Sequence, residues 1–240
     1  MTTLENTVAT PAESALDALL ISDIHLGSEN CQAKPLALLL ERLLHGEILA
    51  HRLIINGDMF DSIDFRRLKK THWKILSLIR HLSDKMQVVW IAGNHDGAAE
   101  IVSHLLGVEV VEEFTFSSGG RKILVVHGHV FDDFIGEHPI LTMCADAVYF
   151  MLQRLDKTHQ VARLAKQHSK VFVRCIEKIE RGAVDMARRK GCEVAVCGHT
   201  HHATFVQAGD VAYFNSGCWT ETPSTYLTFG DGDIRICRHA

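Results

Sequence analysis

The sequence predicts an α/β fold in which two packed sheets carry helices on their outer faces. In the first half of the chain, short apolar runs suited to buried strands alternate with segments whose leucines recur at helical spacing. This alternation is typical of β-α-β units and therefore of a largely parallel sheet. The second half contains further short strands and turns, separated by a long helical stretch at residues 136–190. We expect that stretch to be a helical insertion.

The first half contains three pairs of a strand and a helix. In order, these are 18–22 with about 34–49, 52–56 with 66–83, and 87–91 with 97–106. In the second helix, Trp73, Leu76, Ile79 and Leu82 share one face, which is expected to pack on the sheet.

The second half is expected to be strand-rich on either side of the insertion. The expected strands are 108–111, 114–116, 121–126, 193–197, 204–207, 211–215, 225–229 and 233–237. The turn Gly230-Asp-Gly232 joins the last two as a hairpin. We expect residues 1–16 to be a disordered leader and 17–240 to be one domain.

Composition excludes several classes of protein. The chain has 240 residues, 47% of them hydrophobic and 22% charged, as in an ordinary globular protein. A net charge of −4 argues against general nucleic-acid binding, which needs concentrated positive charge. There is no apolar run long enough to span a membrane. The seven scattered cysteines form no CxxC pair, which indicates reduced thiols and a cytoplasmic location.

Five apolar strands end in polar loops with the same chemistry. The most conspicuous follows the run 123–126 and reads His127-Gly128-His129. The other four are Asp23-Ile-His25, Gly57-Asp58, Gly93-Asn94-His95-Asp96 and Gly198-His199-Thr-His201. In sheets of this kind, ligands bind at the carboxyl ends of the strands. The five loops therefore predict a single site.

The loops supply carboxylate, amide and imidazole groups, which are common metal ligands. The candidate ligands are Asp23, His25, Asp58, Asn94, His127, His199 and His201. Seven are too many for one catalytic ion, which usually takes three protein ligands, but they suit two ions. Asp58 is the expected bridge between the ions. Oxygen and nitrogen ligands without thiolate favour Mn²⁺, Fe or Zn²⁺, and we expect Mn²⁺ first.

These motifs, in this order, resemble the calcineurin-like metallophosphoesterase superfamily over about residues 18–237. The resemblance implies a four-layer αββα sandwich of two mixed sheets flanked by helices, in which a metal-activated water attacks phosphorus. It implies that one ion is held by Asp23, His25, Asp58 and His201. It implies that the other is held by Asp58, Asn94, His127 and His199.

The same resemblance assigns catalytic roles within Gly93-Asn94-His95-Asp96. His95 is expected beside the phosphate, where it stabilises or protonates the leaving oxygen, and Asp96 is expected to orient His95. An imidazole near developing phosphoryl charge contributes electrostatically and as a general acid. Residues that flank the motifs are expected to support the site: Asn56, Asp61 and Asp132, with Asn215 and Trp219 approaching it from the C-terminal segment.

Residues 127–132, the helical insertion, the motif that ends at His201 and the segment 213–219 are together similar to UDP-2,3-diacylglucosamine hydrolases. Those enzymes cleave a nucleotide–lipid pyrophosphate in lipid A biosynthesis, and the insertion caps their site and holds acyl chains. Two positions differ: this chain has His95 where the better-known members have Arg, and His129 where they tend to have Asp. The role of His129 stays open.

The expected insertion is basic, with 11 Lys and Arg residues against 6 Asp and Glu residues in 136–190. Such a surface suits an anionic phosphorylated substrate or peripheral contact with an anionic inner membrane, although an ordinary solvated helical face is the alternative. Phosphate contacts are expected from Lys166, Lys170 and Arg174. Apolar residues that would line an acyl groove, or simply form core, are Phe134, Ile140, Met143, Phe150 and Met151.

Three functions are compatible with the sequence. The first is a dinuclear-metal pyrophosphatase acting on a UDP-linked lipid sugar. The second is a soluble phosphodiesterase or phosphomonoesterase with another nucleotide or sugar phosphate as substrate. The third is a non-catalytic scaffold of the same fold, which is disfavoured because all seven candidate ligands and His95 are present.

Overall fold

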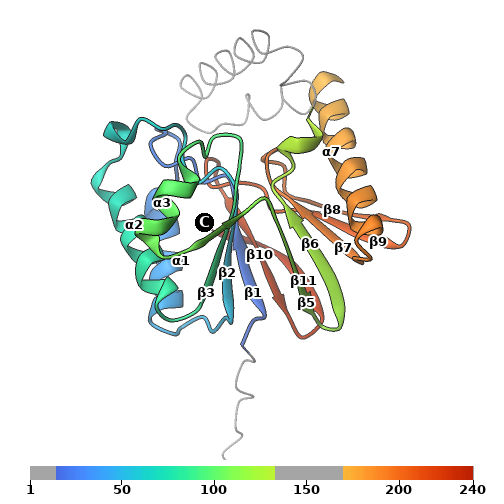
Figure 1. Cartoon of the computed structure of the whole chain (residues 1–240), viewed down its shortest axis with the longest axis horizontal. Coiled ribbons are helices and arrows are strands. Elements are labelled where there is room, and N and C mark those ends of the chain that lie inside the picture. Colours follow the sequence, from blue (N-terminus) through green and yellow to red (C-terminus); the bar gives the residue numbers. More distant parts are fainter. Residues whose placement is uncertain (1–14, 133–169, 240) are drawn as a thin grey trace, which may run out of the picture.

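The structure, a computed structural model of the 240-residue chain, describes residues 15–132 and 170–239. Two sheets pack face to face and carry helices on their outer sides, which makes four layers (Figure 1). Each sheet combines parallel and antiparallel strand pairs. The expected αββα sandwich of two mixed sheets flanked by helices is therefore confirmed.

The first sheet has six strands in the order β11-β10-β1-β2-β3-β4. Their bounds are β1 Ala18–Ile21, β2 Arg52–Asn56, β3 Gln87–Ile91, β4 Glu109–Val111, β10 Ser224–Gly230 and β11 Asp233–His239. The strands β1 to β4 are parallel because helices return the chain to the same edge between them. The expected hairpin of β10 and β11 is confirmed, and it adds the antiparallel side.

The second sheet has five strands in the order β5-β6-β7-β9-β8. Their bounds are β5 Glu113–Ser118, β6 Arg121–Val126, β7 Val194–Cys197, β8 Thr204–Ala208 and β9 Val211–Asn215. The central strands β6, β7 and β9 are parallel, so β6 and β7 end at the same edge of the sheet.

Alternating side chains along the strands build two of the cores. In β1, Leu19 and Ile21 face the helices on one side, whereas Ala18 and Leu20 face the second sheet. This alternation follows from the two-residue period of a strand. All four side chains are fully buried, so β1 lies at the centre of the molecule.

Three helices cover the first sheet: α1 Ala33–Leu44, α2 Lys70–Ser83 and α3 Ala99–Leu106. Helix α1 ends earlier than expected, because the turn at Gly46 takes φ of 76°. Helix α2 starts later, after the short 3-10 helix η1 Phe65–Arg67. The expectation for Trp73 was wrong: this side chain is 54% exposed, and His72 is buried in the same turn of α2.

Helix α7 Lys170–Arg189 covers the outer face of the second sheet. Its residues Ile179, Ala183 and Val184 are buried against strands of that sheet. The C-terminal part of the expected insertion thus packs on the sheet, whereas residues 133–169 lie outside the described residues. Within the described ranges, there is no helix with the length and apolar character needed to cross a bilayer.

Candidate metal centre

The five polar loops meet at one end of the two sheets. Three follow β1, β2 and β3 in the first sheet, and two follow β6 and β7 in the second. Backbone hydrogen bonds join neighbouring loops: the Asp23 amide donates to the Gly57 carbonyl, and the Gly198 amide donates to the His127 carbonyl. The parallel order of the strands therefore brings polar residues that are distant in sequence to one edge.

Three groups of side chains place their ligand atoms within 4.8 Å of one another. They are Asp23 with His25 and His201, His25 with Asp58 and His95, and Asp58 with His127 and His199. In the first group, His201 Nε2 lies 3.2 Å from Asp23 Oδ1 and 3.2 Å from His25 Nε2. In the third, His127 Nε2 lies 3.3 Å from Asp58 Oδ2.

Asp58 occurs in two of these groups. Its Oδ2 atom faces His127 on one side and lies 3.7 Å from His25 Nε2 on the other. Its Oδ1 atom accepts a hydrogen bond of 3.0 Å from the His95 amide, which fixes the orientation of the carboxylate. Asp58 therefore lies between two clusters of ligand atoms, in the arrangement that a bridging carboxylate needs.

The deepest members of these groups are sealed from solvent. Asp23 and His127 are fully buried, and Asp58 is 2% exposed. His127 Nε2 is buried and has no hydrogen-bond partner among the described residues. A buried polar atom without a partner is costly, and here it points at a carboxylate among further imidazoles. Carboxylate oxygens and imidazole nitrogens of this kind and spacing fit divalent ions such as Mn²⁺, Fe²⁺ or Zn²⁺.

The buried Asp58 carboxylate favours a positive charge beside it. Burial acts to raise the pKa of Asp58, but the neighbouring imidazoles, His127 first and then His25 and His95, together hold this pKa well below its usual range. Burial likewise acts to lower the pKa of His127, but Asp58, Asp23 and the Asn56 carbonyl together raise it to about 9. Burial and the neighbouring His201 lower the pKa of His25 to about 4. The anionic Asp58 thus attracts a cation, which a proton on His127 or a metal ion supplies.

Five of the seven predicted ligands take a backbone conformation that side chains rarely adopt. Positive φ angles occur at Asp23 (50°), His25 (51°), Asp58 (49°), His199 (64°) and His201 (56°). Each costs on the order of 1–3 kcal/mol, so such residues persist only where the surrounding structure holds them. In the described residues, Asp231 in the β10–β11 turn is the only other non-glycine residue of this kind. Backbone strain is thus concentrated at the candidate ligands.

Two glycines of the motifs allow the loops to approach each other. A Cβ atom on Gly57 would lie 2.2 Å from His127 Nδ1. A Cβ atom on Gly93 would lie 2.3 Å from both the Asp58 amide nitrogen and Asp58 Oδ1. These distances are too short for any side chain, so glycine is required at both positions for the ligands to converge.

Hydrogen bonds fix which ring nitrogen two of the histidines present. His127 Nδ1 donates to the Asn56 carbonyl at 2.8 Å, which leaves Nε2 to face Asp58. His199 Nε2 lies 3.0 Å from Asp132 Oδ2, which leaves Nδ1 as its available lone pair. Asp61, the third residue expected to support the site, lies 3.7 Å from His25 Nδ1. All three flanking residues therefore contact a histidine of the site.

His95 and Asp96 have different surroundings. His95 is exposed, and its Nδ1 donates to the Asp61 carbonyl at 3.0 Å, so Nε2 is directed away from this bond. The Asp96 carboxylate accepts hydrogen bonds from the Phe60 amide, the Gly93 amide and Trp90 Nε1. These three donors hold the Asp96 carboxylate against the loop from which His95 projects. The expected part of Asp96 in orienting His95 would therefore act through this loop, and it stays a prediction.

Asn94 and His129 lie at the edges of the site. Asn94 is exposed in the loop after β3, directly before His95. His129 begins the short 3-10 helix η2 His129–Phe131, and its ring centroid lies 5.5 Å from that of His127. Burial and the neighbouring His127 lower the pKa of His129 to about 4. The neutral imidazole of His129 therefore lies beside the group formed by Asp58, His127 and His199, and no role is assigned to it.

The described residues include only some of the expected substrate contacts. Arg174 is exposed on α7, and Lys170 begins that helix. Lys166 lies outside the described residues, as do the apolar residues expected to line an acyl groove. Asn215 and Trp219 do approach the site: Asn215 Nδ2 donates to the Gly198 carbonyl at 2.7 Å, and the Trp219 amide donates to the Asp23 carbonyl at 3.0 Å.

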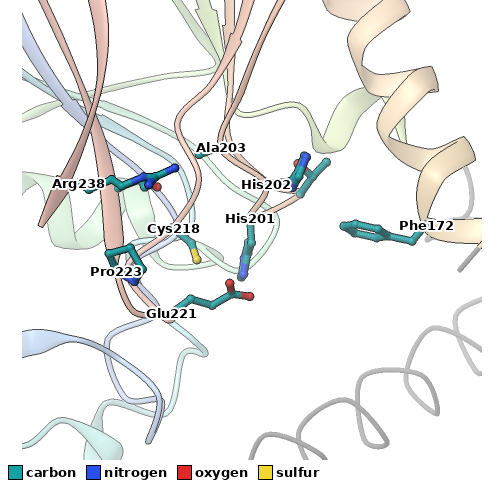
Figure 2. Close-up of a pocket in the computed structure, with 10 residues that line it drawn as sticks. Phe172, His201, His202, Ala203, Cys218, Glu221, Pro223 and Arg238 are labelled. Atoms are coloured by element: carbon teal, nitrogen blue, oxygen red, sulfur yellow. The ribbon is translucent and has the colours of Figure 1, made fainter. Parts of the chain in front are cut away.

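The sequence did not reveal a pocket beside His201 (Figure 2). The cavity has a volume of about 250 Å³ and is lined by Phe172, Thr200, His201, His202, Ala203, Cys218, Glu221, Pro223, Thr225 and Arg238. Most of these residues belong to no motif, and α7, β11 and the segment after β9 bring them together only in the folded chain.

Comparison with known families agrees with this geometry. The family model of the calcineurin-like phosphoesterases matches residues 17–203, which include all five polar loops. The chain belongs to the calcineurin-like phosphoesterase family.

The curated relatives that match this chain are distant. The DNA polymerase II small subunits from two strains of Halobacterium salinarum are 24% identical over 233 residues. The match covers 87% of this chain and 44% of each relative. This chain therefore spans less than half the length of the curated relatives that it matches.

An archaeal phosphodiesterase of solved structure has the same fold. It superposes with a TM-score of 0.50 at 14% sequence identity, over 92% of this chain and 98% of that one. Yfce, a phosphoesterase from E. coli, gives a TM-score of 0.48 at 16% identity, over 93% of this chain and 99% of its own. At these identities the likeness concerns the fold alone.

Replacement of Gly93 by alanine should damage the centre. The new Cβ would overlap the amide nitrogen and Oδ1 of Asp58, so Gly93→Ala is expected to lower stability by about 1–3 kcal/mol and to weaken Mn²⁺ binding. Gly97→Ala is the matched control, because its Cβ would meet only Ile63 Cγ2 at 3.4 Å. Thermal unfolding and Mn²⁺ calorimetry measure both effects. Equal behaviour of the two variants would contradict the steric explanation.

Proposed function

We propose that this phosphoesterase uses two divalent ions, Mn²⁺ in the first instance, to hydrolyse the pyrophosphate of a nucleotide-linked lipid sugar of the UDP-2,3-diacylglucosamine type. The position of Asp58 is the observation that supports the use of two ions. Its carboxylate belongs to one group of ligand atoms with His25 and to another with His127 and His199. One carboxylate in two groups is the arrangement that a pair of ions shares.

Each ion would have four protein ligands. One would be held by Asp23, His25, Asp58 and His201. The other would be held by Asp58, Asn94, His127 and His199. When bound, the two ions supply a water of lowered pKa as nucleophile and neutralise charge on the phosphoryl oxygens. The strained backbone at five of these residues supports the assignment, because it holds the side chains in place before any ion binds.

His95 is the residue of this chain best placed to act on the leaving oxygen. It is exposed at the mouth of the site, and its ring centroid lies 5.0 Å from that of His25. The Asp61 carbonyl accepts from Nδ1, so Nε2 is the nitrogen free to hold or donate a proton toward a substrate. Asp96 acts indirectly, because it fixes the loop that carries His95.

Exposed apolar side chains near the site support a substrate with a lipid part. Ile63 is 68% exposed beside the loop of His95, Val130 is 55% exposed next to His129, and Val173 is 40% exposed on α7. Together with the excess of basic residues in 136–190, they suit a substrate that combines phosphate with acyl chains at an anionic membrane surface. A net charge of −4 does not favour DNA, so we extend no polymerase role to this chain.

The test is turnover by metal-loaded protein. UDP-2,3-diacylglucosamine would be offered beside UDP-N-acetylglucosamine and bis(p-nitrophenyl) phosphate. The proposal expects the acylated substrate to show the highest kcat/KM and to release UMP. Turnover of the two unacylated compounds alone would remove the lipid substrate and favour a soluble phosphodiesterase acting on another nucleotide or sugar phosphate.

Two histidine variants should separate metal binding from proton transfer. His127→Ala removes the imidazole against Asp58 and is expected to abolish both activity and the binding of one ion. His95→Ala should retain both ions and lose rate by roughly 10²–10⁴-fold, as for an acid catalyst. Metal content by elemental analysis and initial rates measure the two effects. Full activity of His127→Ala would show that the ligand assignment is wrong.

Replacement of Asp132 should weaken the binding of one of the two ions. It accepts from His199 Nε2, and removal of such a supporting acceptor typically costs about 10–100-fold in metal affinity. Asp132→Ala is therefore expected to weaken one ion selectively in a calorimetric titration. Asp132→Asn keeps an acceptor oxygen and should restore most of the affinity. If Asn is as damaging as Ala, Asp132 acts through its charge rather than as a positioning acceptor.

A further inference from the structure

The pocket beside His201 has a chemistry that the hydrolytic centre does not use. We call it the Glu221 pocket, and it is defined by His201, Cys218, Glu221, Phe172 and Arg238 with their neighbours in the cavity of about 250 Å³. One of its lining residues, His201, is a predicted metal ligand, so a group bound there would lie beside the proposed ions. Figure 2 shows the carboxyl group of Glu221 directed toward the His201 ring, with Phe172 facing them from α7.

The walls of the Glu221 pocket combine one acidic group with an aromatic face. Glu221 is 8% exposed, so its carboxylate is held inside the pocket rather than on the surface. Phe172 is half-buried at the start of α7, and Pro223 adds apolar surface on the other side. Arg238 on β11 is exposed at the outer end. A ligand here would meet an acceptor on one side and a ring on the other.

Three kinds of substituent can be compared with these walls. A second phosphoryl group would be attracted by Arg238, but inside the pocket it would bring negative charge toward the Glu221 carboxylate, which repels it. An acyl chain offers no hydrogen-bond donor to the carboxylate, and desolvation of a carboxylate without new donors is unfavourable. A sugar ring offers several hydroxyl donors and also an apolar C–H face that can pack on Phe172. The volume is below the range for drug-sized ligands, which suits a single ring.

We propose that the Glu221 pocket binds the sugar ring attached to the scissile phosphate, with hydroxyl groups donating to Glu221 and one face of the ring packing on Phe172. This inference rests on the proposed function, because it places the sugar relative to phosphate hydrolysis at the adjacent centre. It adds the residues that select the organic part of the substrate. The sugar can be a hexosamine or the ribose of a nucleotide, and the experiment distinguishes them.

The experiment compares three substrates with the same leaving group. The p-nitrophenyl ester of glucosamine 1-phosphate carries a hexosamine, the p-nitrophenyl ester of uridine 5′-monophosphate carries a ribose, and bis(p-nitrophenyl) phosphate carries no sugar. Metal-loaded wild type, Glu221→Gln and Phe172→Ala would be assayed beside Phe205→Ala. Phe205 is the matched control, because it is an aromatic residue 52% exposed on β8 that does not line the pocket.

The readout is the ratio of kcat/KM for a sugar ester to that for the sugar-free diester. Loss of a charge-assisted hydrogen bond should lower this ratio about tenfold or more in Glu221→Gln, mainly through KM. A similar fall is expected in Phe172→Ala, and none in Phe205→Ala. A fall confined to the hexosamine ester or to the uridine ester identifies the sugar. A ratio within about twofold of wild type in both pocket variants overturns the inference.

Binding separates failure of the pocket from failure of the proposed function. Glucosamine 1-phosphate and uridine 5′-monophosphate would be titrated into metal-loaded wild type and Glu221→Gln. If wild type hydrolyses neither UDP-2,3-diacylglucosamine nor any of the three esters, the proposed function fails. Weaker binding to Glu221→Gln than to wild type would then still support the pocket, and equal binding would overturn it. Thermal unfolding of each variant verifies that the loss is not one of folding.

Discussion

The buried carboxylate of Asp58 is the interaction on which the arrangement of the site depends. Its side chain meets His25 from the first sheet and His127 from the second, and its Oδ1 accepts from the His95 amide. Its backbone carbonyl accepts from the amides of Ile24 and His25. Three polar loops are thereby fixed to one residue. A carboxylate 2% exposed is tolerable only because so many donors and imidazoles converge on it.

The fold supplies the rigidity that this convergence requires. Left-handed backbone at five candidate ligands costs free energy, and the loops that carry them follow strands whose side chains are almost wholly buried. The parallel register places the ends of β1, β2 and β3 side by side, and β6 and β7 end opposite them in the second sheet. The sandwich thus stabilises a strained cluster of polar residues at the junction of its two sheets.

Local sequence patterns predicted the strands and the motif loops better than they predicted the side-chain contacts between distant segments. The strands 52–56, 87–91, 121–126 and 211–215 have the expected bounds, because each is an apolar run closed by polar or glycine-rich residues. The five motif loops likewise converge as their positions after parallel strands predicted. The role of Asp96 could not be predicted in this way, because the donors on Phe60 and Trp90 reach it only through tertiary packing. The Glu221 pocket was missed for the same reason, since its walls come from four separate segments.

The proposed reaction and the proposed specificity would therefore depend on different parts of the chain. The ligand atoms come from loops whose glycines and strained backbone leave little freedom for change, as Gly57 and Gly93 show. Phe172, Glu221 and Arg238 lie on α7, on the segment after β9 and on β11, outside the loops that carry Asp58 and His127. On the proposed function, a chain of this fold could thus change the organic part of its substrate without rebuilding its centre. His95 and His129 belong to the centre itself, so differences at these two positions would bear on the handling of phosphate rather than on the proposed choice of sugar.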